Sequence, residues 1–264
     1  MPLEESAPML PLRVDADRFF ASLERARARE KGGIGTQNEK LLHATLKDYF
    51  AIEGAVAEYE VEGFFADLFA DGELVEIQTG NFSYLQKKLP PLLEKHPVTV
   101  ICPLMRSKTL FWIDPQTGEL SAGRKSPKKG KYCHLLGQIY PLMDLVGQEG
   151  LRLVVFLYDG EENKRAVGWS MDGKKGSHRI ERIPTQPLDL LELCSPYDYA
   201  ALLPEGCPLT FDAADFSRRT SLKGRRLSGA LKMLLKIGVL SREKQGRSYL
   251  YTVNRKEFIV YDEP

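Results

Sequence analysis

The last quarter of the sequence constrains the fold most, because a pattern with helical spacing there gives way to two short alternating segments. Helices are predicted over 197–203, 212–218 and 222–237, and Gly238 ends the third as a C-cap residue. The apolar face of the third helix consists of Leu227, Ala230, Leu231, Leu234 and Leu235. Residues 239–244 and 248–253 then form a predicted hairpin over Gln245-Gly246. The expected order is therefore three helices followed by a hairpin.

This stretch resembles the winged helix-turn-helix superfamily, including the LLKIGVL junction and the segment SREKQGRSYLYTV at the position of the wing. The resemblance implies a DNA-binding domain over 195–260 whose third helix lies in the major groove. Basic residues precede that helix, lie on it and lie at the wing tip: Arg218, Arg219, Lys223, Arg225, Arg226, Lys232, Lys244 and Arg247. Such cations favour phosphate binding, whereas a winged helix used for protein contact is the alternative.

The formal net charge of +1 conceals a strong asymmetry along the chain. Residues 36–100 contain 11 Asp and Glu against 5 Lys and Arg. Residues 104–185 contain 14 Lys and Arg against 9 acids, and residues 210–256 contain 12 against 3. An acidic block followed by two basic ones indicates a carboxylate-rich site in a molecule that attracts polyanions, with solvated surface charge as the alternative.

The first part of the chain predicts an α/β arrangement. Helices are expected over 13–31, 36–50, 82–95 and 132–146, with Thr36 and Glu39 as a capping box at the start of the second. Strands are expected over 56–63, 64–70, 73–78, 98–102 and 151–158, with a further hairpin over 112–120. Residues 160–183 have the composition of a basic loop. This order predicts a mixed sheet flanked by helices.

Asp71-Gly72 joins two of these strands and is a strong signal for a two-residue hairpin turn. With that turn, Asp67 faces Glu76, and Gln78 lies on the same face of the hairpin. Two carboxylates opposed across strands repel each other, so a bound divalent cation would relieve the repulsion. Exposed acids without a ligand are the alternative.

The segment ADLFADGELVEIQTG, within its helix–hairpin–helix–strand setting, resembles the signature of the PD-(D/E)XK nucleases. The resemblance implies a restriction-endonuclease-like core over 1–190 in which Asp67, Glu76 and the Ile77 carbonyl bind Mg²⁺ or Mn²⁺. It also implies that Glu39 is an auxiliary metal ligand and that the metal activates water for attack on a phosphodiester. A nuclease fold without activity is the alternative.

Gln78 departs from this pattern, because the family has Lys at the third position and Gln cannot act as a general base. As the residue that we expect to orient water, Gln78 is one of four predicted catalytic residues, with Asp67, Glu76 and Glu39. Lys87 or Lys88 on the following helix is a candidate for the missing positive charge.

Two further basic segments, 124–131 and 174–179, are expected to be loops that grip phosphates. Their candidate contacts are Lys128, Lys129, Lys174 and Lys175. Solvated loops without a ligand are equally compatible with this composition. His178 is expected to contact phosphate, since no Ser or Cys partner is evident.

Composition excludes several classes of protein. No apolar run approaches the length of a membrane span, and the N-terminus lacks the pattern of a secretory signal, so a cytoplasmic location is expected. The four Cys and four His are dispersed without the spacing of a metal site. The whole chain resembles a bacterial family that joins such a core to a winged helix; the segments carrying this likeness are FWIDPQTGELSAGRKSPKKG, GWSMDGKKGSHRIERIP and LPEGCPLTFDAADF.

The function expected from the sequence is a Mg²⁺-dependent deoxyribonuclease, with a non-catalytic DNA-binding regulatory or architectural protein as the alternative. DNA is preferred over RNA as the partner, no membrane is expected, and the oligomeric state is left open, a homodimer included.

Overall fold

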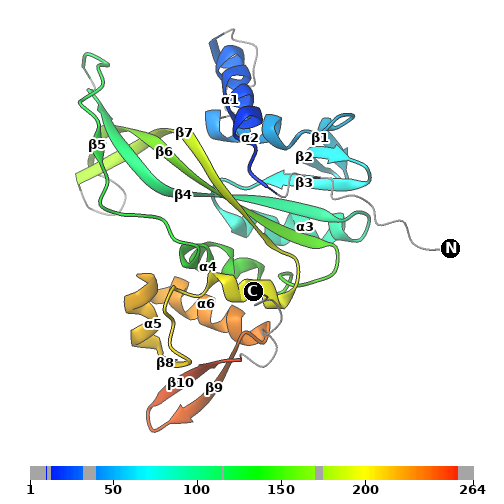
Figure 1. Cartoon of the computed structure of the whole chain (residues 1–264), viewed down its shortest axis with the longest axis vertical. Helices are drawn as coiled ribbons and strands as arrows, with labels where there is room; N and C mark the ends of the chain where they lie inside the picture. Colours follow the sequence, from blue (N-terminus) through cyan, green and yellow to red (C-terminus); the bar gives the residue numbers. More distant parts are fainter. Residues whose placement is uncertain (1–9, 11–12, 32–39, 115, 170–174, 255–264) are drawn as a thin grey trace, which may run out of the picture.

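The largest element of the fold is a mixed sheet in which three central strands run parallel and the outer pairs run antiparallel. The structure, a computed structural model, describes residues 10, 13–31, 40–114, 116–169 and 175–254 (Figure 1). Within them the sheet has seven strands in the order β1-β2-β3-β4-β6-β7, with β5 paired to β4. The strands are β1 (Val56–Val61), β2 (Phe64–Ala70), β3 (Glu73–Ile77), β4 (Val98–Ile113), β5 (Arg124–Lys125), β6 (Leu151–Trp169) and β7 (Lys175–Leu193).

Helices cover both faces of this sheet (Figure 1). On one face lie α1 (Ala16–Lys31) and α2 (Leu41–Phe50), whose apolar side chains pack against Leu68, Val75 and Phe156. On the other lie η1 (Phe82–Tyr84), α3 (Leu85–Leu93), α4 (Cys133–Ile139) and η2 (Tyr140–Leu142). The expected α/β class, a mixed sheet flanked by helices, is confirmed. Within the described residues no helix combines the length and hydropathy of a transmembrane span.

The β2–β3 hairpin has the register expected from its sequence. Asp71 (φ 46°) and Gly72 (φ 86°) both have positive φ, as a two-residue turn of type I′ requires. Strands β2 and β3 pair at Leu68–Val75, Phe69–Leu74 and Ala70–Glu73. The next positions along the two strands are therefore Asp67 and Glu76.

The expectation of a loop over 160–183 is wrong. Strands β6 and β7 continue through most of this range as a long antiparallel hairpin, and β4 extends beside β6 to Ile113. The sequence is polar here because ion pairs replace apolar contacts. The buried carboxylate of Glu162 lies 3.0 Å from Lys108 Nζ and 3.2 Å from Lys164 Nζ. Charged residues that pair across strands stabilise a sheet without an apolar pattern.

Two helix boundaries also differ from the expectation. Helix α2 begins at Leu41 after Lys40, and the expected capping residues Thr36 and Glu39 lie outside the described residues. The helix expected over 132–146 is shorter, because α4 ends at Ile139 and a 3₁₀ turn containing Pro141 follows. Proline has no backbone N–H to continue an α-helix.

The C-terminal segment forms three helical elements and a small sheet, in the predicted order. The elements are η3 (Pro196–Leu202), β8 (Thr210–Asp212), α5 (Ala213–Thr220), α6 (Gly224–Lys236), β9 (Leu240–Gln245) and β10 (Ser248–Val253). Strands β9 and β10 form the expected hairpin, in which Gln245 pairs with Ser248. Strand β8 adds to its other edge and has no counterpart among the predicted elements.

Two glycines allow α6 to pack closely against α4 and η2. A Cβ added at Gly229 of α6 would lie 2.4 Å from Tyr140 Cδ2, and one at Gly137 of α4 would lie 2.6 Å from Leu222 Cδ2. Apolar residues of α6 thereby join the same buried cluster as α3, α4 and one sheet face. The C-terminal segment and the large sheet therefore share one continuous core.

Candidate functional site

Asp67 and Glu76 are the next residues beyond Leu68 and Val75, the last pair of the β2–β3 ladder. The backbone N–H of Ile77 donates a hydrogen bond to Asp67 Oδ2 over 2.7 Å. The Asp67 carboxylate therefore lies against the end of β3, and its negative charge contributes to a raised Glu76 pKa. The two acids therefore lie at the same end of the ladder, but their side-chain partners come from helices on opposite faces of the sheet, His43 of α2 for Asp67 and Lys88 of α3 for Glu76.

Glu76 is buried, with an exposed fraction of 5%. Lys88 of α3 forms a close ion pair with Glu76 Oε1 and donates a hydrogen bond to Phe65 O over 2.6 Å. Burial raises the pKa of Glu76 to about 7, and the charge of Lys88 opposes this shift without cancelling it. Lys88 therefore occupies the position proposed for a displaced lysine.

His43, in the first turn of α2, is a site residue that sequence reasoning missed. Its Nε2 lies 3.2 Å from Asp67 Oδ1, so both oxygens of Asp67 have a partner. Glu39, the predicted auxiliary acid, lies outside the described residues. The signal was available in the sequence, because His43 follows Glu39 by four residues and would share its face of a helix.

Gln78 follows β3 and uses its amide nitrogen within the next loop. Its Nε2 donates to Asn81 O over 2.7 Å, while its backbone N–H donates to Ile101 O over 2.9 Å. The hydrogen bond from the Gln78 side chain to Asn81 fixes the start of the loop that leads to α3.

The acid pair suits a hard divalent cation. Within the described residues, no three His, Cys, Asp or Glu side chains converge as a metal cluster. Mg²⁺, however, is commonly held by one or two carboxylates while water and substrate phosphate supply the other ligands. Asp67 and Glu76 provide two carboxylates, each of which already has a protein partner, His43 and the Ile77 N–H for Asp67 and Lys88 for Glu76. The residues present therefore fit Mg²⁺ or Mn²⁺.

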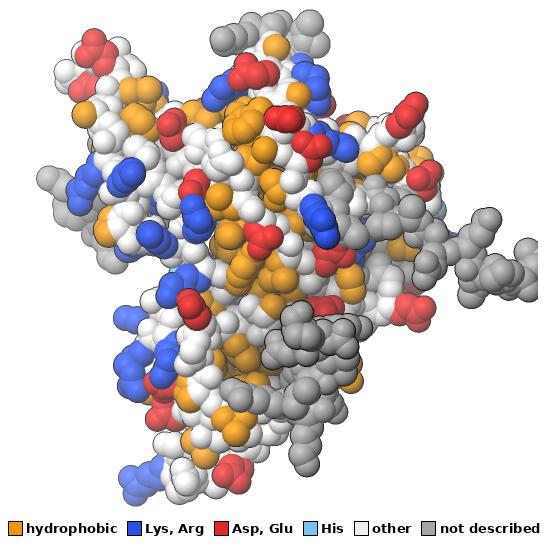
Figure 2. All heavy atoms as spheres, viewed as in Figure 1, with side chains coloured by type: hydrophobic (Ala, Val, Ile, Leu, Met, Phe, Trp, Pro, Cys, Tyr) orange, Lys and Arg blue, Asp and Glu red, His pale blue; other side chains and the backbone are white. Residues whose placement is uncertain are grey.

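The residues of the C-terminal segment that were predicted to bind nucleic acid divide into two groups. Arg218 and Arg219 both form ion pairs with Asp215, at 3.2 Å and 3.0 Å. The others are exposed on α6, before it and on the β9–β10 hairpin: Lys223, Arg225, Arg226, Lys232, Lys244 and Arg247. Figure 2 shows Lys and Arg side chains along the left edge of the molecule, from the end of the large sheet to the tip of this hairpin.

The two basic segments of the large sheet differ from the expectation. Lys128 and Lys129 are exposed after β5. Lys175, however, begins strand β7 instead of lying in a loop, and Lys174 lies outside the described residues. His178 is also a β7 residue and is exposed. Arg179 and Arg182 of the same strand line a cleft and were not singled out from the sequence.

Residues 40–194 match the family described as "Domain of unknown function (DUF8091)". This range covers more than half of the chain. The protein belongs to this family. The DUF8091 domain extends from Lys40 to Cys194 and so contains Asp67, Glu76 and Lys88.

The DUF8091 protein is also 32% identical over 232 residues to a protein of Treponema pallidum (strain Nichols) whose name reads "Uncharacterized protein". That similarity covers 85% of this chain and 88% of the relative. It therefore extends beyond the DUF8091 domain. No solved structure matches the chain.

Proposed function

We propose that this protein is a metal-dependent nuclease that cleaves DNA. The proposal is carried by the position of Asp67 and Glu76 at the same end of the β2–β3 ladder, where the Ile77 N–H binds Asp67 and the buried Glu76 pairs with Lys88. A helix, an antiparallel hairpin carrying both acids, a second helix and a parallel strand follow in this order, as in a PD-(D/E)XK core. The restriction-endonuclease-like fold is part of the proposal.

Asp67, Glu76 and the Ile77 carbonyl would hold Mg²⁺ or Mn²⁺. The metal would lower the pKa of a bound water and neutralise charge on the phosphodiester. His43 and the Ile77 N–H hold Asp67 in place from two sides. Each of these contacts reduces the rotational freedom of the carboxylate, which is how a second layer of residues positions a ligand.

Lys88 supplies the cation that Gln78 cannot supply. Its ammonium group is buried beside Glu76 and favours the ionised form of that carboxyl. The family pattern has this charge on β3, two residues after the glutamate, whereas here it comes from α3. Gln78 would then orient water through its side-chain oxygen.

The C-terminal segment would bind the DNA duplex as a winged helix, with α6 in the major groove and the β9–β10 hairpin on the backbone. Two observations support this role: the order of α5, α6 and the hairpin, and the exposure of Lys223, Arg225 and Lys232. Exposed cations on these elements would release counterions from phosphates.

The test is cleavage of plasmid and single-stranded DNA in Mg²⁺ or Mn²⁺ by the full chain. Asp67→Asn should abolish cleavage and leave DNA binding unchanged. Asp71→Asn is the matched control, because Asp71 is the exposed acid of the same hairpin turn and Asn tolerates its positive φ. Cleavage by Asp67→Asn at the rate of the control would refute the assignment.

A second candidate function is DNA binding without catalysis. It is favoured by the contacts that already occupy polar groups of the site. Asp67 has two partners, and Gln78 donates a hydrogen bond to Asn81. Calorimetric titration with Mn²⁺ separates the two functions. Binding that Asp67→Asn removes supports the nuclease, whereas no heat of binding and no cleavage support the second candidate.

A further inference from the structure

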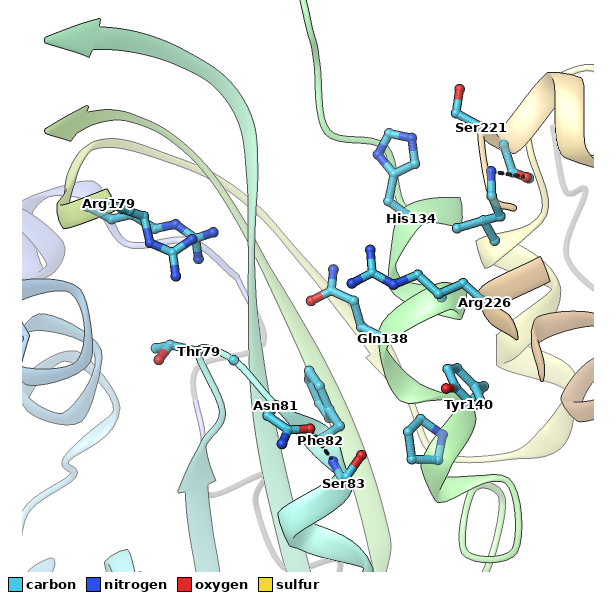
Figure 3. A pocket seen from close by; sticks show the side chains of 16 residues that line it. Thr79, Asn81, Phe82, Ser83, His134, Gln138, Tyr140, Arg179, Ser221 and Arg226 are labelled. Carbon is cyan, nitrogen blue, oxygen red and sulfur yellow. Dashed lines mark hydrogen bonds between the residues drawn. The ribbon is translucent and has the colours of Figure 1, made fainter. Parts of the chain in front are cut away.

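A cleft of about 710 Å³ lies between the loop after β3, helix α4, strand β7 and the turn between α5 and α6. Figure 3 shows Arg179 on one side and Arg226 reaching into the cleft from the other, with Gln138 close to Arg226. Thr79 and Asn81, which follow Gln78 closely in the chain, also line the cleft. The cleft therefore lies between the loop that follows Gln78 and the C-terminal segment.

The lining of this arginine cleft is cationic and rich in hydrogen-bond donors. Arg179, Arg182 and Arg226 contribute guanidinium groups, and Asn81 and Gln138 contribute amides. As far as the chain is described, no carboxylate lines the cleft. Such a lining attracts a ligand with several negative charges and hydrogen-bond acceptors.

On the β7 side of the cleft, the Lys and Arg side chains outnumber the carboxylates that could neutralise them. Glu162 is shared by Lys108, Lys164 and Arg182, whose Nε lies 3.8 Å from its carboxylate. That Nε is buried without a hydrogen-bond partner. Among the described residues none accepts a hydrogen bond from Arg179, which is exposed and has Glu162 and Arg182 as neighbouring charges. A single carboxylate thus lies among four cations.

The volume of the arginine cleft limits the form of a nucleic acid that can enter. Pockets of about 300–1,000 Å³ hold ligands of drug size, which corresponds to about two nucleotides and excludes a duplex. A single strand exposes its phosphates and its bases to such a cleft. Guanidinium groups on two walls match successive phosphates, and the amides match base edges.

We propose that the arginine cleft binds a single-stranded segment that continues from a duplex held by the C-terminal segment. The substrate class is therefore duplex DNA with a single-stranded tail or flap. The inference rests on the proposed function, because it identifies the strand that reaches Asp67 and Glu76.

The test is fluorescence anisotropy of the full chain in EDTA, with a blunt duplex and with the same duplex extended by a tail of ten thymidines. Wild type should bind the tailed duplex at least about tenfold more tightly. Arg179→Gln should remove about tenfold of that affinity and lower the salt slope by about 0.7, the value for one phosphate of a single strand.

Two control variants separate the cleft from the rest of the surface. Arg165→Gln removes an exposed charge from the same β6–β7 hairpin, outside the cleft, and should retain the tail preference. Arg218→Gln should weaken both duplexes equally. Equal binding of blunt and tailed duplexes by wild type would overturn this inference but not the proposed function. The same holds if Arg179→Gln binds the tailed duplex as tightly as Arg165→Gln does. Absence of all DNA binding would overturn the proposed function as well.

Discussion

Replacement of Glu76 by Gln should change how the stability of the protein depends on pH. In the folded chain burial raises the pKa of Glu76 to about 7, against 4.5 for the ordinary side chain. The folded state therefore keeps this proton over a range in which the unfolded state has released it. Stability then falls as pH rises, because the unfolded state binds fewer protons.

The magnitude follows from the two pKa values of Glu76 and corresponds to about 3 kcal/mol. The difference in free energy of unfolding between wild type and Glu76→Gln should fall by this amount between about pH 4.5 and 7.5. Above pH 7.5 it should stay constant. Subtraction of the variant removes the contribution of every other group that titrates alike in both proteins.

The assay is urea unfolding followed by circular dichroism at pH 5, 6, 7 and 8, in EDTA so that no metal contributes. Glu60→Gln, which removes an exposed acid from neighbouring β1, is the control. Two outcomes count against this prediction: the difference in free energy of unfolding between wild type and Glu76→Gln is independent of pH, or it rises with pH. Either result would refute the conclusion that the Glu76 carboxyl is buried and has a raised pKa.

Three further predictions concern the same elements. Lys88→Met should destabilise the protein by about 3 kcal/mol at pH 8, because it leaves a buried carboxylate unpaired. At pH 5 the loss should be much smaller, because Glu76 is then protonated. Equal losses of stability at both pH values would contradict this prediction. Mn²⁺ at a hundred times its dissociation constant should stabilise wild type by about 2.7 kcal/mol in thermal unfolding, with no effect on Asp67→Asn. Gly229→Ala should lower the free energy of unfolding in urea by about 1–3 kcal/mol, because the added Cβ meets the Tyr140 ring. Adding Tyr140→Ala to the same chain should recover part of this loss, whereas additive losses would count against the contact.

Local signals in the sequence predicted the hairpin and its acids. Asp71-Gly72 fixes the turn, and the turn fixes a register whose last pair, Leu68–Val75, directly precedes Asp67 and Glu76. Lys88 was one of two candidates, and the helical position that reaches Glu76 depends on how α3 packs on the sheet. The order of elements after Pro196 was also predictable, since each carries its own periodicity or turn residue.

Long-range contacts explain what the sequence did not predict. The strands over 160–183 depend on the pairing of Glu162 with Lys108, Lys164 and Arg182, which come from three different strands. His43 meets Asp67 only after α2 has packed against the sheet. Arg179 and Arg226 are 47 residues apart in the chain, so their common cleft has no local signature.

The close contact of α6 with Tyr140 through Gly229 has a geometric consequence. With no side chain between them and a common core on both sides, the C-terminal segment has little freedom to swing relative to the sheet. A duplex held on α6 would then meet the acids at a constant number of nucleotides from its bound end. If the protein is the proposed nuclease, it would cut at a constant distance from the bound duplex, and its products would share one length.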